Sequence, residues 1–244
     1  MMLKLDILAF GAHPDDVELG CAGTLLSAIA EGKKVGVIDL TKGELGTRGT
    51  TSQRLKEAQL ASQIMGLSVR DNLGMADGFF ENNTENQFSI IETIRRFQPS
   101  IIFCNAPEDR HPDHGRAAKL VEDAAFLSGL SKLKTTHNGN EQAAWRPTQV
   151  FHYIQSRSLT PNFVVDISGF MDKKMEAILA HGSQFYDPNS KEPETFISGT
   201  AFLEFVKGRA KELGQQIGVQ YAEGFITKKM LGIGSLDAII QNKT

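Results

Sequence analysis

The sequence has little of what marks secreted, membrane-bound or nucleic-acid-binding proteins. It contains only two cysteines, Cys21 and Cys104, in 244 residues. Two cysteines outside any Cys-x-x-Cys pair are too few for a disulfide framework, so free thiols in a reducing compartment are expected. No run approaches the roughly 18 apolar residues of a membrane span, and the N-terminus, with Lys4 and Asp6, does not resemble a secretory signal. The net charge of −3 offers nucleic acid or an anionic membrane no attraction. A cytoplasmic protein without nucleic-acid or membrane partners is expected.

Two nucleotide-binding signatures are also missing. The first expected strand is not followed by the Gly-x-Gly-x-x-Gly pattern of dinucleotide-binding folds. The glycine-rich stretch 41–50 lacks the Gly-Lys-Ser/Thr ending of a phosphate-binding loop, and it follows the second strand. Hydride transfer with a nicotinamide cofactor and phosphoryl transfer are therefore disfavoured.

The pattern of apolar residues predicts an α/β fold. Short apolar runs alternate with helix-like segments, which indicates successive βαβ units and a parallel sheet. Strands are expected at 3–10, 35–40, 68–73 and 100–104, and helices at 16–31, 51–65, 86–97 and 112–126. We expect one domain over 1–244, with a Rossmann-like, doubly wound, mostly parallel core over about 1–150. A smaller C-terminal α+β layer should follow over about 150–244. The polar segment 128–147 is expected to be mobile or loosely structured.

Two clusters of polar side chains stand at the ends of expected strands. His13, Asp15 and Asp16 lie between the first strand and the following helix. His111 and His114 follow the fourth strand. In a doubly wound sheet the first and fourth strands are neighbours at the point where the strand order reverses, which is where such folds bind ligands. Each cluster alone could be a helix cap, but together they favour a shared site.

Their chemistry fits a metal-dependent hydrolase. A catalytic zinc ion takes about three protein ligands and keeps one position open, and His13, Asp16 and His114 supply such a set. Asp15 remains as a general base for water, and His111 remains to stabilise an oxyanion. This inventory suits hydrolysis of an amide or ester. A site of two histidines and one carboxylate also suits ferrous iron, so zinc and iron both remain open.

Substrate-binding candidates surround these clusters in the sequence. Arginine binds carboxylates and hydroxyls with a planar fork, and a carboxylate accepts hydrogen bonds from sugar hydroxyls. Asp113 is expected to orient a metal ligand or to cap a helix. The candidates for contact with the substrate are Arg48, Arg54, Arg110, Glu44 and His181.

These motifs resemble those of a known family. The stretches 12–18 and 111–114, together with Gly20, Gly23, the 41–44 loop, Arg54 and the 181–184 segment, are similar to the zinc-dependent N-acetylglucosaminyl deacetylases of the PIG-L or LmbE-like family. Segments 43–49 and 181–185 resemble the branch that deacetylates N-acetylglucosaminyl malate in bacillithiol biosynthesis.

The resemblance implies roles for particular residues. It implies metal ligation by His13, Asp16 and His114, with Asp15 as the base and His111 stabilising the oxyanion. It further implies substrate contacts at Arg54 and Arg110, a small amino-sugar substrate, and a homo-oligomer such as a hexamer. Two alternatives stay open: a thiol-conjugate amidase of the same family, and a non-catalytic carbohydrate- or metal-binding module.

Overall fold

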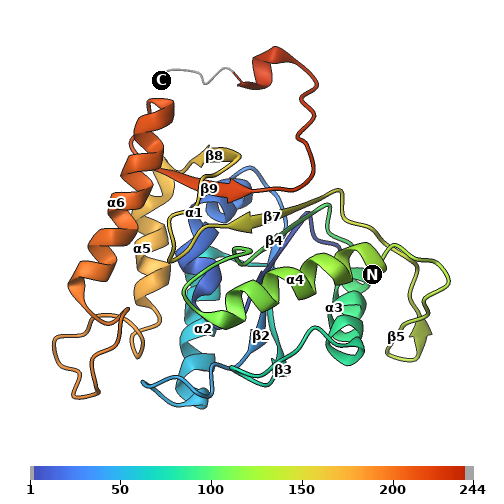
Figure 1. Cartoon of the computed structure of the whole chain (residues 1–244), viewed down its shortest axis with the longest axis horizontal. Helices are drawn as coiled ribbons and strands as arrows, with labels where there is room; N and C mark the ends of the chain where they lie inside the picture. The colour runs from blue at the N-terminus through green and yellow to red at the C-terminus, as the bar shows by residue number, and fades with distance from the viewer. Residues whose placement is uncertain (1–2, 240–244) are drawn as a thin grey trace.

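One seven-stranded sheet organises residues 3–239, which are the part of the chain that this computed structural model describes. Its strand order is β3-β2-β1-β4-β7-β9-β8 (Figure 1). The first five strands of this order, β3, β2, β1, β4 and β7, run parallel to one another. Strand β9 is antiparallel to both of its neighbours, β7 and β8. The strands are β1 Ile7–Gly11, β2 Val35–Thr41, β3 Val69–Met75, β4 Ile101–Cys104, β7 Gln149–Tyr153, β8 Phe163–Asp166 and β9 Ala222–Ile226. The expected α/β class with a doubly wound, mostly parallel sheet is confirmed.

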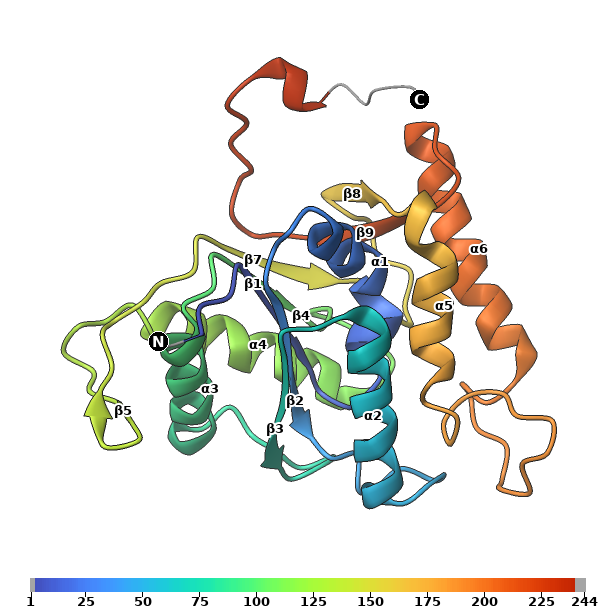
Figure 2. The same ribbon diagram turned by 180° about the vertical axis from the view of Figure 1, so that it is seen from behind.

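Helices cover both faces of the sheet (Figures 1 and 2). Alternation along β1 shows why: Leu8 and Phe10 pack toward α3 and α4, whereas Ile7 and Ala9 pack toward α1 and α2. Side chains of a strand point alternately to opposite faces, so a strand that is apolar throughout needs cover on both. The helices are α1 Asp16–Ala30, α2 Thr51–Met65, α3 Thr84–Phe97, α4 Pro112–Leu127, α5 Met171–Leu179 and α6 Thr200–Ile217, with short 3₁₀ turns η1 Ser168–Phe170 and η2 Leu236–Ile239.

Strands β1 and β4 are neighbours, as expected. They pair in parallel with Ile7 opposite Ile101 and Ala9 opposite Phe103. The chain leaves β1 toward one side of the sheet and leaves β4 toward the other, so the two following loops diverge from one point. This geometry brings residues 12–16 beside residues 105–114.

The smaller C-terminal part has mixed α and β content, and its strands continue the same sheet. Strand β7 pairs with β4, and β9 and β8 extend the sheet beyond it. Helices α5 and α6 lie side by side in both ribbon views, and a third apolar cluster joins them to α1 through Leu19 (Figures 1 and 2).

The segment 128–147 differs from expectation. It forms a short hairpin of β5 Thr136–His137 and β6 Asn140–Glu141, and it is not loosely structured. One reason is Arg95 in α3, whose side chain is only 1% exposed. Its guanidinium donates to the carbonyl oxygens of Ser128, Leu130 and Leu133 at 2.8–2.9 Å. A polar composition therefore concealed a segment that is anchored from another element.

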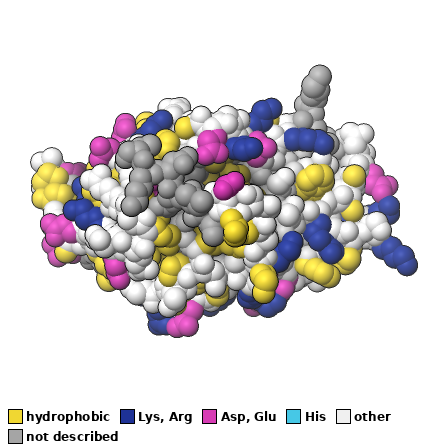
Figure 3. All heavy atoms as spheres, turned by 90° about the horizontal axis from the view of Figure 1, so that it is seen from above, with side chains coloured by type: hydrophobic (Ala, Val, Ile, Leu, Met, Phe, Trp, Pro, Cys, Tyr) yellow, Lys and Arg dark blue, Asp and Glu magenta, His cyan; other side chains and the backbone are white. Residues whose placement is uncertain are grey.

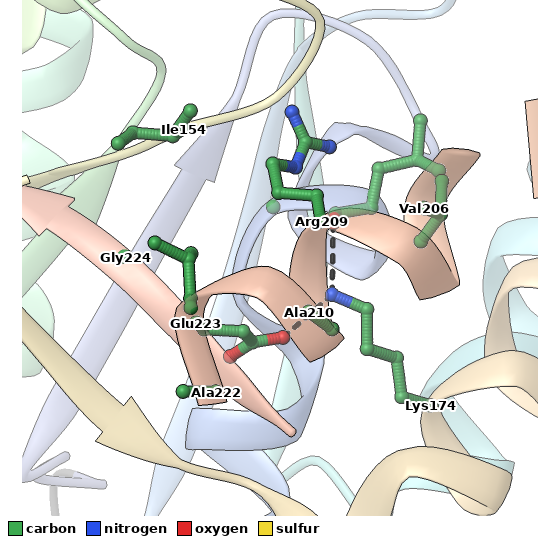
Figure 4. Close-up of a pocket in the computed structure, with 11 residues that line it drawn as sticks. Ile154, Lys174, Val206, Arg209, Ala210, Ala222, Glu223 and Gly224 are labelled. Carbon is green, nitrogen blue, oxygen red and sulfur yellow. Dashed lines mark hydrogen bonds and ion pairs between the residues drawn. The ribbon is translucent and has the colours of Figure 1, made fainter. Parts of the chain in front are cut away.

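A buried ion pair connects the C-terminal part to α1. Lys174 of α5 donates to the Glu223 carboxylate of β9 at 2.6 Å (Figure 4). It also donates to the carbonyl of Leu19 at 2.9 Å. Glu223 also accepts hydrogen bonds from the backbone N–H groups of Gly23 and Thr24. The pair thus ties three elements together through one carboxylate.

The molecular surface mixes charges of both signs. On the face shown in Figure 3, acidic and basic side chains are interspersed and are not gathered by sign. Within residues 3–239, no helix combines the length and apolar character needed to cross a bilayer.

Candidate active site

The two polar clusters predicted from the sequence meet at the ends of β1 and β4. Asn105, which directly follows β4 and is fully buried, holds them together. Its side chain accepts a hydrogen bond from the Ala12 N–H at 2.9 Å and donates one to Asp16 Oδ2 at 3.0 Å. The loop after one strand is therefore fastened to the loop after its neighbour.

Two of the predicted residues face Asp16, and a third lies beside them. His114 Nε2 lies 3.2 Å from Asp16 Oδ1, and His13 Nδ1 lies 3.5 Å from Asp16 Oδ2. The ring of His111 is 4.6 Å from that of His13, centroid to centroid. One nitrogen from each of these three histidines lies within 4.8 Å of the others, a spacing that could hold a metal ion.

Carboxylates hold the opposite nitrogens of both histidines that face Asp16. His13 Nε2 lies 2.9 Å from Asp77 and 3.3 Å from Asp113. His114 Nδ1 lies 2.6 Å from Asp109. Metal-binding histidines characteristically donate their second ring N–H to such a partner, which fixes the ring and its tautomer. This arrangement leaves His13 Nδ1 and His114 Nε2 turned toward the same place, so the donor set fits a divalent metal ion.

The electrostatics of the cluster favour a cation. Burial alone would lower the pKa of His13, but the three carboxylates around it raise it well above its ordinary value. The pKa of His114 is likewise raised to about 9, because Asp16 and Asp109 outweigh its burial. Burial would raise the pKa of Asp16, yet His114 and His13 hold it well below its usual range. Positive charge is therefore stabilised at this point.

Asp15 behaves differently from its neighbour. It is 4% exposed, and its backbone has a φ of 128°, a region that non-glycine residues rarely adopt and that concentrates at functional sites. Asp15 stands at the N-cap position of α1, but its side chain makes no hydrogen bond to the first turn of that described helix. The interpretation of Asp15 as a helix cap is therefore wrong. Burial raises the pKa of Asp15 to about 6, against the lowering effect of Arg54. A carboxylate near pKa 6 can exchange protons close to neutral pH.

His111 begins helix α4. The backbone N–H of Asp113 donates to His111 Nδ1 at 3.2 Å, so this histidine caps the helix. Burial lowers the pKa of His111, and the neighbouring rings of His13 and His114 lower it further. The ring is then neutral at pH 7, and because Nδ1 accepts a hydrogen bond, the proton resides on Nε2.

The predicted substrate residues fall into two groups. Arg54 is buried and donates to the carbonyls of Gly43 and Pro14 at 2.9 and 3.0 Å, with one Nη 3.3 Å from Asp15. Glu44 is exposed, and its carboxylate accepts a hydrogen bond from the Asp77 N–H. Arg54 thus holds the 41–50 loop and Asp15 in position from the protein interior, whereas Glu44 lies at the surface of the same loop.

The other three candidates involve the C-terminal part. Arg110 is exposed, and its guanidinium lies 4.3 Å from the ring centroid of Phe196. Arg48 is buried against Ser190, which accepts from it at 2.6 Å. His181 is fully buried with Glu18 Oε1 3.5 Å from its Nε2, and neither ring nitrogen has a hydrogen-bond partner among the described residues. The structure therefore brings Arg110 to the surface beside His111 and keeps His181 inside.

Four supporting residues were not identified from the sequence. Asp77 and Asp109 hold His13 and His114, while Asn105 and Gln155 donate to Asp16. All four lie within five residues of the end of β3, β4 or β7, so their position at the carboxyl edge of the sheet was the available signal.

Comparisons with known proteins show which sequences this chain is similar to. A family model described as PIG-L: GlcNAc-PI de-N-acetylase matches residues 8–125. The diacetylchitobiose deacetylase of Thermococcus kodakarensis is 28% identical over 232 residues, which cover 89% of this chain and 81% of that protein. A probable N-acetyl-alpha-D-glucosaminyl L-malate deacetylase 2 of Bacillus anthracis is 26% identical over 196 residues, covering 73% and 81%.

A solved structure gives a stronger match over the full length. The conserved protein TT1542 from Thermus thermophilus is 38% identical, with a TM-score of 0.83. The alignment covers 94% of this chain and 98% of that one. Both motif clusters described above lie within the residues that the family model matches. The chain belongs to the PIG-L (LmbE-like) family of deacetylases.

Proposed function

We propose that this protein is a metal-dependent hydrolase that removes the N-acetyl group from an N-acetylglucosamine derivative. The observation that carries the proposal is the difference between the two adjacent carboxylates that follow β1. Asp16 is surrounded by histidines and has a lowered pKa, whereas Asp15 beside it has a pKa raised to about 6. One carboxylate is thus suited to hold a cation and the other to move a proton.

In this proposal His13, Asp16 and His114 hold the metal ion, with zinc as the preferred occupant and iron as the alternative. A different third ligand, His111, is less suitable because its Nε2 carries the proton while Nδ1 accepts from the Asp113 N–H. A bound divalent ion would supply Lewis acidity, polarising the amide carbonyl and activating water. Asp77, Asp113 and Asp109 orient the two histidines from behind.

The remaining residues carry the proton transfers. Asp15 takes a proton from the attacking water as general base and later delivers it to the departing amine. His111 donates a hydrogen bond from Nε2 to the oxyanion that develops at the carbonyl oxygen when water attacks the carbonyl carbon. It can do so as a neutral imidazole, so its lowered pKa does not weaken this role. Arg54 keeps the Asp15 carboxylate in place through its contact at 3.3 Å.

The substrate is proposed from the family resemblance and from the exposed residues Arg110 and Glu44, which we call the rim of the site. We assign the contacts with the hydroxyl or carboxylate groups of an amino-sugar to Arg110 and Glu44, and their exposure supports this assignment. Arg48, Arg54 and His181 would then support the pocket walls and contact the substrate less directly. N-acetylglucosaminyl malate, the substrate in bacillithiol biosynthesis, is the preferred compound, and one relative is described as a probable deacetylase of it. A thiol-conjugate amidase is the second candidate within the same chemistry.

Acetate release tests the proposal. Purified protein would be assayed with N-acetylglucosaminyl malate, diacetylchitobiose and N-acetylglucosamine, before and after chelator treatment and after re-addition of zinc or ferrous iron. Preference for the malate compound supports the bacillithiol branch, and preference for diacetylchitobiose assigns the protein to oligosaccharide deacetylation. Metal binding without turnover of any amide would leave a non-catalytic binding module as the explanation.

We propose in addition a cytoplasmic location and a homo-oligomeric state. The two cysteines, Cys21 and Cys104, are buried and unpaired, in keeping with a reducing compartment. The homo-oligomer, with a hexamer as the expected form, is proposed from the family resemblance alone. Light scattering after size exclusion would measure the mass directly.

A further inference from the structure

Asp77, two residues beyond the end of β3, touches three separate parts of the site. Its Oδ1 lies 2.9 Å from His13 Nε2, and its Oδ2 accepts the backbone N–H of Leu45 at 2.8 Å. Its own N–H donates to Glu44 Oε1 at 3.1 Å. Because the side chain is 6% exposed, these contacts are sheltered from competing water. One buried carboxylate therefore links a metal-type histidine to the loop that follows β2.

Asp77 is a better partner for His13 than its rival Asp113. The imidazole has one proton at Nε2, and Asp113 stands farther from it, at 3.3 Å. Asp113 also accepts from the Arg116 guanidinium at 2.8 Å and from the Gly78 N–H, which share its charge. By contrast, no lysine or arginine in residues 3–239 forms an ion pair with Asp77. Its full negative charge consequently acts on the imidazole and on one backbone amide.

We propose that Asp77 is the positioning residue that couples the 42–48 loop to the metal site. It holds the His13 proton on Nε2, which leaves Nδ1 free to coordinate, and it fastens the backbone of the loop that carries Glu44. Metal affinity and the order of the loop then depend on the same carboxylate. The inference rests on the metal site of the proposed function and extends it to a residue that the sequence motifs do not contain.

An Asp77→Asn substitution separates this role from simple packing. Asparagine has nearly the same shape, but it keeps only one acceptor oxygen and turns an N–H₂ group toward the other donor. It can satisfy either the His13 Nε2–H or the Leu45 N–H, and it cannot satisfy both. Loss of the carboxylate partner of a metal-binding histidine typically weakens metal affinity about 10- to 100-fold.

The first measurement is the zinc dissociation constant, by competition with a chromophoric chelator. Asp77→Asn should raise it by about 10- to 100-fold. Asp71→Asn is the matched control, because Asp71 lies in β3 itself and is exposed, with Arg96 3.5 Å away. That variant should bind zinc as tightly as the wild type. Asp77→Glu, which keeps the charge and both acceptor oxygens, should recover most of the affinity.

The second measurement is the rate of tryptic cleavage after Arg48 in the metal-loaded protein. Arg48 is 4% exposed, so cleavage there requires the loop to open. Asp77→Asn should accelerate this cleavage several-fold, while Asp71→Asn should leave it unchanged. Circular dichroism on each variant checks that the fold is retained, and Asp77→Ser, which also lacks the carboxylate, replaces Asp77→Asn if the amide variant does not fold.

The outcomes are separable from those of the deacetylase assay. Unchanged zinc affinity in Asp77→Asn would overturn the positioning role, and unchanged cleavage would overturn the link to the loop. Asp77→Glu behaving no better than Asp77→Asn would contradict the argument from charge and acceptors. None of these readouts requires turnover, so an inactive protein would refute the proposed function without touching this inference.

Discussion

Residues 7–127 and residues 128–239 contribute to the candidate site in different ways. The first region supplies both polar clusters and both histidines that face Asp16. The second region supplies hydrogen bonds that hold the site residues in position. Gln155 donates to Asp16 at 2.6 Å, and the backbone N–H of Arg157 donates to Asp109 at 2.7 Å. The family model matches only the first of the two regions.

This difference indicates which region holds the reacting groups and which region affects stability and substrate affinity. The groups of the first region that we propose to react come from short motifs beside strand ends, where backbone geometry is fixed by the sheet. Those of the second region, Gln155 and the backbone of Arg157, reach the site from the loop that follows β7. We therefore expect substitutions in the first region to act on turnover, and those in the second to act on stability or on substrate affinity.

The largest effect is expected for Asp15→Asn. Removing a general base typically slows a reaction by about 10²- to 10⁴-fold. The metal content should stay at the wild-type level, because Asp15 is proposed not to coordinate the ion. The measurement is kcat for acetate release together with metal analysis of the same sample. Full activity in this variant would eliminate Asp15 as the base.

The pH dependence gives an independent check on the same residue. Asp15 must be deprotonated to accept a proton, and burial raises its pKa to about 6, partly opposed by Arg54. The rate should therefore fall about tenfold per pH unit below about pH 6 and level off above it. A rate that stays level down to about pH 4.5 would contradict the raised pKa.

Lys174→Met tests the contribution of the second region to stability. Removal of one partner leaves the Glu223 carboxylate buried and unmatched, which typically costs about 3–5 kcal/mol. Urea unfolding monitored by circular dichroism measures the loss. The double variant Lys174→Met, Glu223→Gln should recover part of it, because the amide oxygen can still accept from α1. Loss below about 1 kcal/mol would mean that the pair does not hold the two regions together.

Asp109→Asn changes a residue of the first region that contacts both regions. Asp109 accepts from His114 and from the backbone of residues 156 and 157. We expect zinc affinity to fall about 10- to 100-fold, as for other carboxylates behind a metal-binding histidine. Chelator competition measures it, and wild-type affinity would show that β7 and its following loop do not tune the site.

The sequence predicted the strands, the helices and the meeting of the two clusters, because these follow from local periodicity and from the order of parallel strands. It could not predict that the Arg54 guanidinium would bind Asp15 and two carbonyl groups inside the protein, since those partners lie 11 to 40 residues away. For the same reason the sequence did not identify Asp77, whose partners His13 and Leu45 lie 64 and 32 residues away. The order of segment 128–147 was missed because it depends on contacts with residues 92–99, which local composition does not reveal.

The smallest effect is expected at the rim, with Phe196→Ala. The Arg110 guanidinium lies 4.3 Å from the Phe196 ring, and such an exposed cation–π contact contributes about 0.5–1 kcal/mol, or roughly a two- to fivefold change in affinity. If Arg110 contacts the substrate, losing this support should raise KM by that factor and leave kcat nearly unchanged. Phe126→Ala is the matched control, because Arg146 covers that ring at the same 4.3 Å and lies outside the proposed site. Equal KM values for the two variants would remove Arg110 and the second region from substrate recognition, and would leave the motifs of the first region to determine it alone.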